Sequence, residues 1–239
     1  MPGWAIHTIV ANKISDKINI NKNNFIFGNI VPDINNGYLV EDISKKISHM
    51  DTHFTKEEDI QEKKFNFKNI ERFKDEYKNK MDNPIVLGCF THLLTDSFWN
   101  QIAFDEHYVY GSAKEFEGIK LHSGEFVKCE KREATAMKQR EFKEFGSRLL
   151  KQNANILFPS YNENIILEAK DIVEFNITRN DVMNVIEYLN DVTRNQQIEE
   201  DFEFVVFSEQ ELQKRFEDTI DYCLKEISTV DKFNIIRKW

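Results

Sequence analysis

The sequence of 239 residues is poor in the two residues that most often form turns, with 8 Gly and 4 Pro. These counts are roughly half and a third of the numbers expected for an average globular protein. A fold of many short strands needs such residues at nearly every connection between strands. The shortage therefore excludes a β-sandwich or β-barrel of many short strands.

Cysteine is also scarce, since only Cys89, Cys129 and Cys223 occur, widely spaced and without a C-x-x-C pair. An odd number of cysteines at such spacing is typical neither of a disulfide framework nor of a cysteine zinc site. We interpret them as reduced thiols, some of which lie in the core.

Long apolar runs and dense basic runs are both missing. No apolar stretch approaches the ~18 residues that span a bilayer, and residues 1–7 lack the features of a secretory signal peptide. We therefore expect a soluble cytoplasmic protein without a transmembrane segment. The 32 Lys and Arg against 41 Asp and Glu give a net charge of -9. Because duplex-DNA binders neutralise phosphates with basic residues, duplex nucleic acid is not expected as a partner.

The sequence does contain enough large apolar side chains for a core. Apolar residues make up 41% of the chain and include 20 Phe, although 31% of the residues are charged. A chain of this size with this content can bury a sizeable core. No Pro/Gly/Ser-rich or low-complexity stretch offers a linker, so we expect one domain over residues 1–239.

Apolar residues at helical spacing predict an all-α fold, a bundle of many helices. Four of them recur at spacing four near the start and predict a first helix over about 4–19. These are Ile6, Val10, Ile14 and Ile18. Further helices are predicted at about 65–77, 84–101, 131–152, 163–175, 179–195 and 208–228.

Two stretches are expected to lie outside helices. The short apolar segment 25–32 ends at Pro32, and a loop is expected to begin near Asp33. Residues 103–130 contain three glycines and show no clean period. We expect them to form a long irregular connection, a kind of segment that is often functional in compact domains.

The predicted helix at 84–101 is apolar nearly all round, which is typical of the centre of a bundle. It nevertheless carries His92 and Asp96, four residues apart on one face. A buried carboxylate without a partner costs several kcal/mol, so Asp96 needs a cation, several hydrogen-bond donors or a metal. A hydrogen bond between His92 and Asp96 that serves stability alone is the simplest alternative.

Three further candidates for a metal site come from other elements. His7 falls on the buried face of the first helix, Asp33 lies in a turn, and His49 follows a polar stretch. With His92 and Asp96 they make three His and two Asp. Nitrogen and oxygen donors of this kind are favoured by zinc.

Two of the glycines and one of the prolines lie near these candidates. Gly28 and Pro32 precede Asp33, and Gly88 lies one turn before His92. Because glycine lets two backbones approach closely, we expect the chain to turn or to come into close contact at these positions around a buried site.

Four segments that carry these candidates occur in a characteristic order: Ile6–Ile14, Gly28–Ile34, Ser48–His49 and Leu87–Trp99. In this order they resemble the zinc-dependent phospholipase C family, and more closely its short, unexported bacterial members than its secreted ones. The resemblance covers about residues 4–100. It implies that Asp33, His49, His92 and Asp96 bind one zinc ion.

The resemblance further implies that Asp96 bridges to a second zinc ion, which also takes His7. Two zinc ions carry more positive charge than the two aspartates neutralise. The remaining charge would bind a phosphate oxygen and lower the pKa of a bridging water, which supplies hydroxide for attack on phosphorus. Asp33 and Asp96 are thus the predicted catalytic residues.

The sequence departs from the secreted members of that family at three points. In those enzymes the N-terminal amine of a Trp is a ligand, whereas Trp4 lies inside this chain. They carry a His six residues after the bridging Asp, where this chain has Ile102, and no His follows His122 to complete a third site. We therefore expect one or two zinc ions and no three-zinc cluster.

The remaining histidines leave alternatives open. His53 lies four residues after His49 and could replace or supplement it as a ligand if this stretch is helical. Otherwise His53 belongs to the rim of a pocket, where it could bind substrate. His107 and His122 are interpreted as surface residues, although His107 could reach the mouth of the site.

Aromatic residues could line a substrate pocket. Tyr38 and Tyr108, with Phe54 and Tyr110, could form a wall for a quaternary ammonium group through cation–π attraction. Core packing is the ordinary explanation for aromatic residues in so aromatic a chain. We take Tyr38, His53 and Tyr108 as the candidate substrate-binding residues.

These observations favour a zinc-dependent hydrolase of phosphoesters that resembles phospholipase C and acts on a small phosphoester or a phospholipid. The sequence lacks the H-E-x-x-H, G-x-x-x-x-G-K, G-x-G-x-x-G and G-x-S-x-G motifs of other mechanisms. Two alternatives remain. One is a phosphodiesterase acting on nucleotides or single-stranded nucleic acid, and the other is a non-catalytic helical binding protein with a structural metal.

Overall fold

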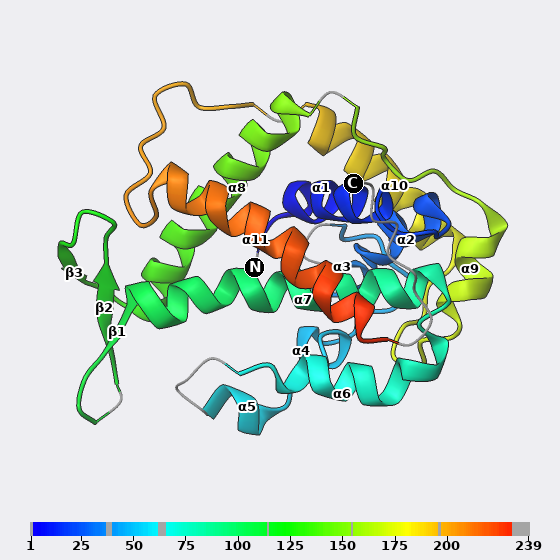
Figure 1. The fold of residues 1–239 in the computed structure, drawn as a ribbon, viewed down its shortest axis with the longest axis horizontal. Helices are drawn as coiled ribbons and strands as arrows, with labels where there is room; N and C mark the ends of the chain where they lie inside the picture. Colours follow the sequence, from blue (N-terminus) through cyan, green and yellow to red (C-terminus); the bar gives the residue numbers. More distant parts are fainter. Residues whose placement is uncertain are drawn as a thin grey trace.

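The helix α7, Pro84–Ile102, lies at the centre of the computed structural model, which describes residues 2–36, 40–61, 66–113, 115–153, 155–195 and 197–230. Pro84 occupies the first turn, and the Asn83 side chain accepts hydrogen bonds from the first free amides. Helices pack against α7 from several sides (Figure 1). The prediction of a buried central helix at 84–101 is confirmed.

The first helix, α1, covers Trp4–Ser15 and lies beside α7 (Figure 1). It ends four residues before the predicted limit of 19, although Ile18 beyond its end is still buried. Its apolar residues pack into the same core as those of α7. His7 is fully buried on this helix, as its position in the apolar pattern predicts.

The segment at 22–34 is helical, which the sequence analysis missed. Helix α2 covers Lys22–Gly28 and is capped by the side chain of Asn21, and α3 covers Val31–Ile34. The expectation of a loop from Asp33 is wrong, because Pro32 stands in the first turn of α3. Backbone amides have no partner within the helix at that position, so proline, which has no amide hydrogen, is well tolerated there. Asp33 is therefore held on a helical turn.

Three short elements and one longer helix follow on the other side of α7. Ser48 caps the single turn α4, His49–Thr52, through a hydrogen bond from the Asp51 amide. Helix α5 covers Glu57–Gln61, α6 covers Lys68–Tyr77, and the 3-10 turn η1 covers Lys78–Lys80. In Figure 1, α4 lies between α6 and α7.

Residues 103–130 are not the irregular connection that was predicted. A π-helical turn, η2 (Ala103–His107), leads into an antiparallel sheet of β1 (Tyr108–Tyr110), β2 (Phe116–Lys120) and β3 (Phe126–Lys128). The register pairs Val109 with Gly118, and Gly118 with Lys128. Strands of three to five residues are too short to show a period of two in the sequence.

Four further helices follow in the described part of the chain, as predicted. The helices are α8 (Lys131–Gln152), α9 (Glu163–Ala169), α10 (Arg179–Arg194) and α11 (Glu209–Ser228). Helix α9 is shorter than the predicted 163–175. With eleven α-helices and one small sheet among the described residues, the mainly α fold class is confirmed.

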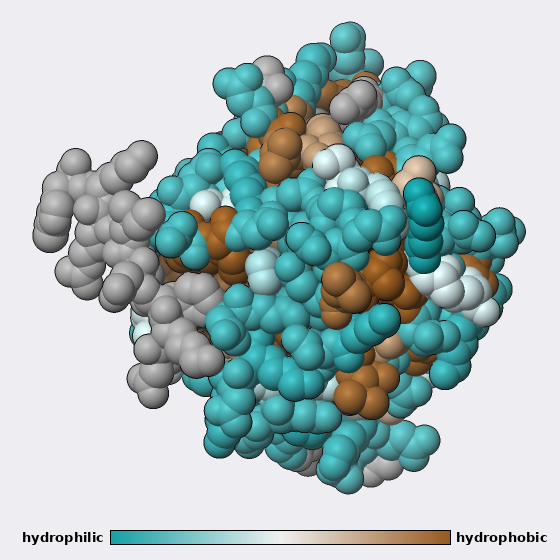
Figure 2. Space-filling view, turned by 90° about the vertical axis from the view of Figure 1, so that its right-hand side faces the viewer, coloured by the Kyte–Doolittle hydropathy of each residue, from teal (hydrophilic) through white to brown (hydrophobic). Residues whose placement is uncertain are grey.

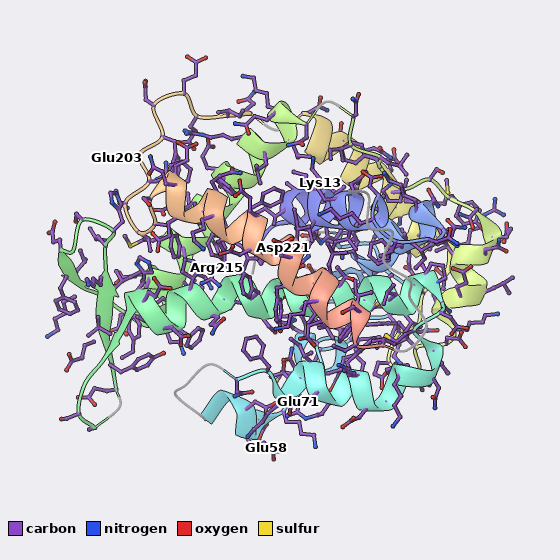
Figure 3. All side chains as sticks on the ribbon, viewed as in Figure 1. Lys13, Glu58, Glu71, Glu203, Arg215 and Asp221 are labelled. Carbon is purple, nitrogen blue, oxygen red and sulfur yellow. The ribbon has the colours of Figure 1, made fainter. Side chains whose placement is uncertain are left out.

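Charged side chains cover the outside of this arrangement. Figure 3 labels examples on several elements, among them Lys13 on α1, Glu58 on α5 and Asp221 on α11, all of which are exposed. Figure 2 shows one face on which apolar residues form small patches separated by hydrophilic ones. None of the helices in the described ranges is long and apolar enough to cross a membrane.

The cysteines are free thiols, as predicted. Cys89 and Cys223 are buried, and Cys129 is partly exposed. Burial raises the pKa of Cys223 to about 12. Both buried thiols therefore serve as small apolar residues of the core.

Candidate metal centre

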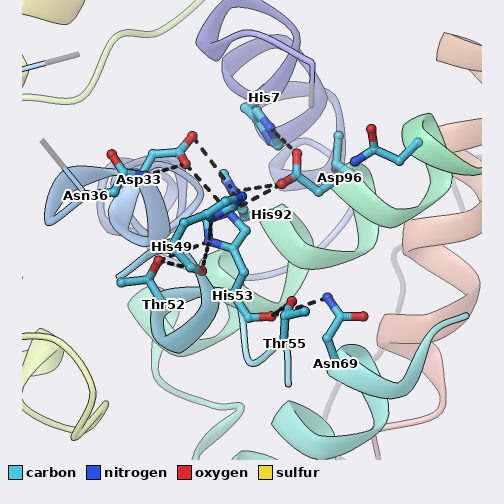
Figure 4. Close-up of polar contacts among 12 residues, drawn as sticks. His7, Asp33, Asn36, His49, Thr52, His53, Thr55, Asn69, His92 and Asp96 are labelled. Atoms are coloured by element: carbon cyan, nitrogen blue, oxygen red, sulfur yellow. Dashed lines mark hydrogen bonds and ion pairs between the residues drawn. The ribbon is translucent and has the colours of Figure 1, made fainter. Parts of the chain in front are cut away.

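Five titratable side chains from separate parts of the chain meet beside α7 (Figure 4). Each is almost fully buried, with exposed fractions between 0% and 6%. They are His7 from α1, Asp33 from α3, His53 directly after α4, and His92 and Asp96 from α7.

Four of these residues hold their donor atoms at similar distances. The Nε2 atoms of His53 and His92 are 3.2 Å apart, and they lie 3.4 Å and 3.5 Å from Asp96 Oδ2. Asp33 places one carboxylate oxygen 3.5 Å from His53 Nε2 and the other 3.9 Å from His92 Nε2. Ligands in a tetrahedron around zinc are about 3.3–3.6 Å apart. The donor atoms of His53, His92 and Asp96 are thus spaced as zinc ligands are, and Asp33 lies next to them as a candidate fourth ligand.

Asp96 also connects this group to His7. The Nε2 atom of His7 lies 3.1 Å from Asp96 Oδ1, the carboxylate oxygen that is not shared with His53 and His92. The donor atoms of His7, His92 and Asp96 lie within 4.8 Å of one another, as do those of Asp33, His53 and His92. The two carboxylate oxygens of Asp96 thus face two overlapping groups of donors.

The three histidines each turn Nε2 into the group and Nδ1 away from it. His92 Nδ1 lies 2.8 Å from the backbone oxygen of Asn29, His7 Nδ1 lies 3.2 Å from the side-chain oxygen of Asn29, and His53 Nδ1 lies 3.1 Å from the backbone oxygen of His49. A backbone or amide oxygen only accepts, so each Nδ1 can donate a proton to it, and a neutral ring that does so keeps the lone pair of its Nε2 for an ion. All three Nε2 atoms point into the group.

One acceptor of this group is left without a hydrogen bond from the described part of the chain. Asp96 Oδ2 is a buried oxygen with no hydrogen-bond partner among the described residues. A buried acceptor without a partner is costly, and a bound cation removes that cost. This oxygen without a partner, together with the inward Nε2 atoms, shows that the residues present fit a metal ion.

The electrostatics agree with two ionised carboxylates beside neutral and charged imidazoles. Burial lowers the pKa of His7, and the neighbouring His92 acts in the same direction. Burial would lower the pKa of His92 as well, but Asp96 and Asp33 raise it to about 9. Burial opposes ionisation of Asp96, yet the charge of His92 keeps its pKa well below the ordinary value. Without an ion, the two carboxylates are thus ionised beside a neutral His7 and a charged His92.

A comparison with known families shows to which family the chain belongs. The family model described as zinc-dependent phospholipase C matches residues 4–192. The chain belongs to the zinc-dependent phospholipase C family. The match confirms the resemblance found in the sequence and extends it well beyond residue 100. No curated protein and no solved structure matches the chain significantly.

For this zinc-dependent phospholipase C family member, the sequence left His49 and His53 open as alternatives. The structure places His53 Nε2 among the donor atoms, whereas His49 lies half-buried at the edge with its Nδ1 2.6 Å from His53 Nδ1. Burial and the neighbouring His53 lower the pKa of His49 to about 4. His49 is therefore a neutral neighbour of the group, and its backbone oxygen orients His53.

Helix α6 fastens the segment that carries both histidines. Asn69 donates a hydrogen bond to the backbone oxygen of His53, and Arg72 donates to that of Phe54 while it also pairs with Asp59. Phe54 has a φ of 56°, a left-handed conformation that is unfavourable for a bulky residue. The contacts with α6 hold this backbone and so fix the position of His53.

Of the aromatic residues proposed for substrate binding, the described Tyr108 and Phe54 lie in different parts of the fold. Tyr38 lies outside the described residues. Tyr108 is buried in the small sheet, where its hydroxyl contacts Thr135 and its ring contacts Phe116. Phe54 packs its ring against α6, in keeping with core packing. Of the predicted substrate-binding residues, His53 is itself one of the five residues of the candidate metal centre.

The last two histidines differ in position. His122 is exposed, as predicted. The interpretation of His107 as a surface residue is wrong, because it is 5% exposed and bonds to the Lys120 backbone oxygen and to Glu211. These partners come from the sheet and α11, whose presence beside His107 the local sequence does not indicate.

Sequence reasoning missed the polar residues that surround the donors. The indole of Trp4 donates to Asp33 Oδ2 over 3.1 Å, and the Asn36 amide donates to Asp33 Oδ1 over 3.2 Å. Asn29 contacts two of the histidines. Asn29 and Asn36 lie within four residues of Asp33, so asparagines close to a predicted ligand were the signal available.

Proposed function

We propose that this chain hydrolyses phosphoesters with zinc, and that its substrate is a phospholipid or another small phosphoester. The observation that carries the proposal is the buried group of three imidazole Nε2 atoms and two carboxylates that face one another. Membership of a zinc-dependent phospholipase C family supports the same reaction.

Asp33, His53, His92 and Asp96 would hold one zinc ion, and His7 with the second oxygen of Asp96 would hold another. Zinc bound in this way supplies a Lewis acid for a phosphoryl oxygen and a water that is ionised at neutral pH. The protein contributes fixed positions, since the central helix α7 carries two of the donors and is buried along most of its length.

The roles of the two aspartates follow from their surroundings. Asp33 is held by Trp4 and Asn36, so its carboxylate keeps one orientation. Asp96 turns one oxygen toward His7 and the other toward His53 and His92. We assign both to the catalytic centre, where they neutralise part of the metal charge and leave the rest for the phosphate.

Metal analysis of protein purified without an affinity tag tests this proposal. We expect one to two equivalents of tightly held zinc in the wild type, and less than about half an equivalent in Asp96→Ala and in His92→Ala, because structural ligands bind zinc tightly only as a set. His122→Ala is the matched control, since it removes an exposed histidine outside the group. Equal zinc content in all four proteins would refute the site.

The reaction is tested on the same proteins. A chromogenic phosphodiester should be hydrolysed by the wild type and by His122→Ala, but not by Asp96→Ala or His92→Ala. Competition with lecithin and with an oligonucleotide then separates the substrate classes. Inhibition by lecithin supports the proposal, whereas inhibition by the oligonucleotide alone supports a nucleic-acid phosphodiesterase.

One observation favours a second candidate, a helical protein with a structural zinc. Asp33, His53, His92 and Asp96 would supply four protein ligands to one ion, which is the pattern of closed structural sites. A protein that holds one equivalent of zinc, loses stability on chelation and hydrolyses no phosphoester would fit this second function.

A further inference from the structure

Asn29 lies between α2 and α3 and is fully buried. Its backbone oxygen is 2.8 Å from His92 Nδ1, and its side-chain oxygen is 3.2 Å from His7 Nδ1. The two histidines come from helices α7 and α1, and Asn29 belongs to neither. One residue thus contacts the outer nitrogens of two histidines that are 85 positions apart in the sequence, at 7 and 92.

The two imidazole rings are held parallel by this arrangement. Their centroids are 4.1 Å apart and their planes differ by 9°. Both rings direct Nε2 toward Asp96, at 3.1 Å for His7 and 3.5 Å for His92. A ring whose Nδ1 is hydrogen-bonded has little freedom to turn about its χ2 angle. The two oxygens of Asn29 therefore fix the direction in which Nε2 of each ring points.

Close contact between α2 and α7 fixes the backbone of Asn29. The Asn29 amide bonds to the Phe25 oxygen over 3.1 Å and ends α2. A Cβ atom on Gly88 would lie 2.7 Å from that amide nitrogen, and one on Gly28 would lie 2.5 Å from the Ile85 oxygen. The two glycines therefore let the backbones touch and place the Asn29 oxygen against His92.

We propose that Asn29 is a positioning residue of the metal centre, whose two oxygens hold the Nδ1–H of His7 and of His92 so that both rings present Nε2 to the ion. This inference rests on the proposed function, because positioning the rings matters only if they bind a metal ion. The contacts of Asn29 with His7 and with His92 can be tested separately, because a substitution removes the side-chain oxygen and keeps the backbone oxygen.

Zinc affinity is the first measurement. Residues that orient zinc-bound histidines typically contribute about 10–100-fold to affinity. We expect Asn29→Leu to bind zinc about 10–100-fold more weakly in competition with a chelator, and Asn29→Asp, which keeps an acceptor at this place, to recover most of the loss. Asn24→Leu is the control, because Asn24 is a buried asparagine of the adjoining helix α2 that bonds to Glu168 and Asn162.

The exchange of ring protons with water is the second measurement and does not depend on catalysis. In the wild type, NMR should show slowly exchanging Nδ1–H protons on both His7 and His92. In Asn29→Leu the His7 proton should exchange fast, while the His92 proton stays slow because its backbone partner remains. Circular dichroism establishes that each variant is folded.

The outcomes separate this inference from the proposed function. Unchanged zinc affinity and an unchanged His7 proton in Asn29→Leu would overturn the role of Asn29, even if the wild type is an active zinc hydrolase. A His7 ring that carries its proton on Nε2 in the wild type would overturn it as well. If the wild type binds no zinc, the proposed function fails, and the two ring protons of the metal-free protein still decide whether Asn29 holds both rings.

Discussion

At the scale of single residues, the choice between His49 and His53 is the sharpest question that the structure raises. His53 is 4% exposed and contacts Asp33, His92 and Asp96, whereas His49 lies at the edge. Both sit within one helical turn and the residue after it, so the sequence presents them as near equivalents. Which one points inward depends on the contacts of α6 with the backbone of His53 and Phe54.

We predict that His53→Ala loses most of its zinc affinity and that His49→Ala loses much less. The first substitution removes a donor atom from the group, whereas the second removes only a neighbour and keeps the backbone oxygen that orients His53. Titration of both variants against a fluorescent zinc chelator measures the difference. A larger loss in His49→Ala would show that the ring of His49 moves in to bind the ion.

His107 gives a second prediction at this scale, on the dependence of stability on pH. Burial alone would lower its pKa, but the bonds to Glu211 and to the Lys120 oxygen, with the charge of Glu106, raise it above the ordinary value. A histidine whose pKa is higher in the folded protein contributes its full stability below the unfolded pKa of about 6.5 and loses it as the pH rises through the folded pKa.

The measurement is urea unfolding of the wild type and of His107→Gln across this range. The wild type should exceed the variant in free energy of unfolding by more at about pH 5.5 than at about pH 9, because only the charged ring donates at both nitrogens. A difference that stays constant over the range would mean that His107 is uncharged in the folded protein.

At the same scale, the sequence predicted more of the donors than of the residues around them. His7, Asp33, His92 and Asp96 were named from helical spacing and from the family resemblance, and the structure brings all four together. Asn29 and Trp4 were not named as polar neighbours, because a hydrogen bond to a distant residue leaves no periodic pattern in the chain.

At the scale of elements, helix prediction succeeded where the apolar period was long. The predicted 131–152 and the observed Lys131–Gln152 agree, and α7 extends the predicted 84–101 by one residue. The failures are short elements. Helix α2 and the three strands have seven residues or fewer, and their existence depends on contacts with α7 and α8 that a local pattern does not contain.

The contact between α2 and α7 leads to a prediction for this scale. A Cβ atom on Gly88 would lie 2.4 Å from the Phe25 backbone oxygen, and backbone cannot turn aside as a side chain can. We therefore expect Gly88→Ala to lower the free energy of unfolding by about 1–3 kcal/mol or more, and to weaken zinc binding, because α2 and Asn29 must shift away from His92.

Gly146→Ala is the control for that substitution. It also lies inside a helix, but its Cβ would meet only the side chains of Ala5 and Ile6, at 3.2 Å. Helix propensity favours alanine by about 1 kcal/mol and offsets this crowding. Equal effects of the two substitutions on zinc affinity would contradict a special role for the contact between α2 and α7.

At the scale of the whole molecule, the net charge of the chain and the local charge at the candidate metal centre have to be considered separately. The net charge of -9 is that of the whole chain, whereas the candidate metal centre is a buried group that contributes only two of its carboxylates. A bound pair of zinc ions would make this point locally positive within an acidic protein. The sequence argument against duplex nucleic acid therefore does not oppose the binding of a single phosphate group.

The metal centre also links elements that are far apart along the chain: α1, α3, the end of α4, and α7. A ligand that binds only the folded state stabilises it by about 2.7 kcal/mol at a free concentration of 100 times its Kd. For a chain of this length, each kcal/mol raises the Tm by about 2–4 °C. Zinc should therefore raise the Tm of the metal-free protein by about 5–10 °C at that concentration.

Thermal unfolding before and after chelation, and again after zinc is restored, checks this expectation. In Asp96→Ala the chelator should leave the Tm unchanged, because that variant lacks the carboxylate shared by both donor groups. Magnesium should not restore the Tm, since imidazole nitrogens are poor ligands for it. If chelation lowers the Tm of Asp96→Ala as much as that of the wild type, the stabilising ion binds elsewhere, and the assignment of this group as the metal centre fails.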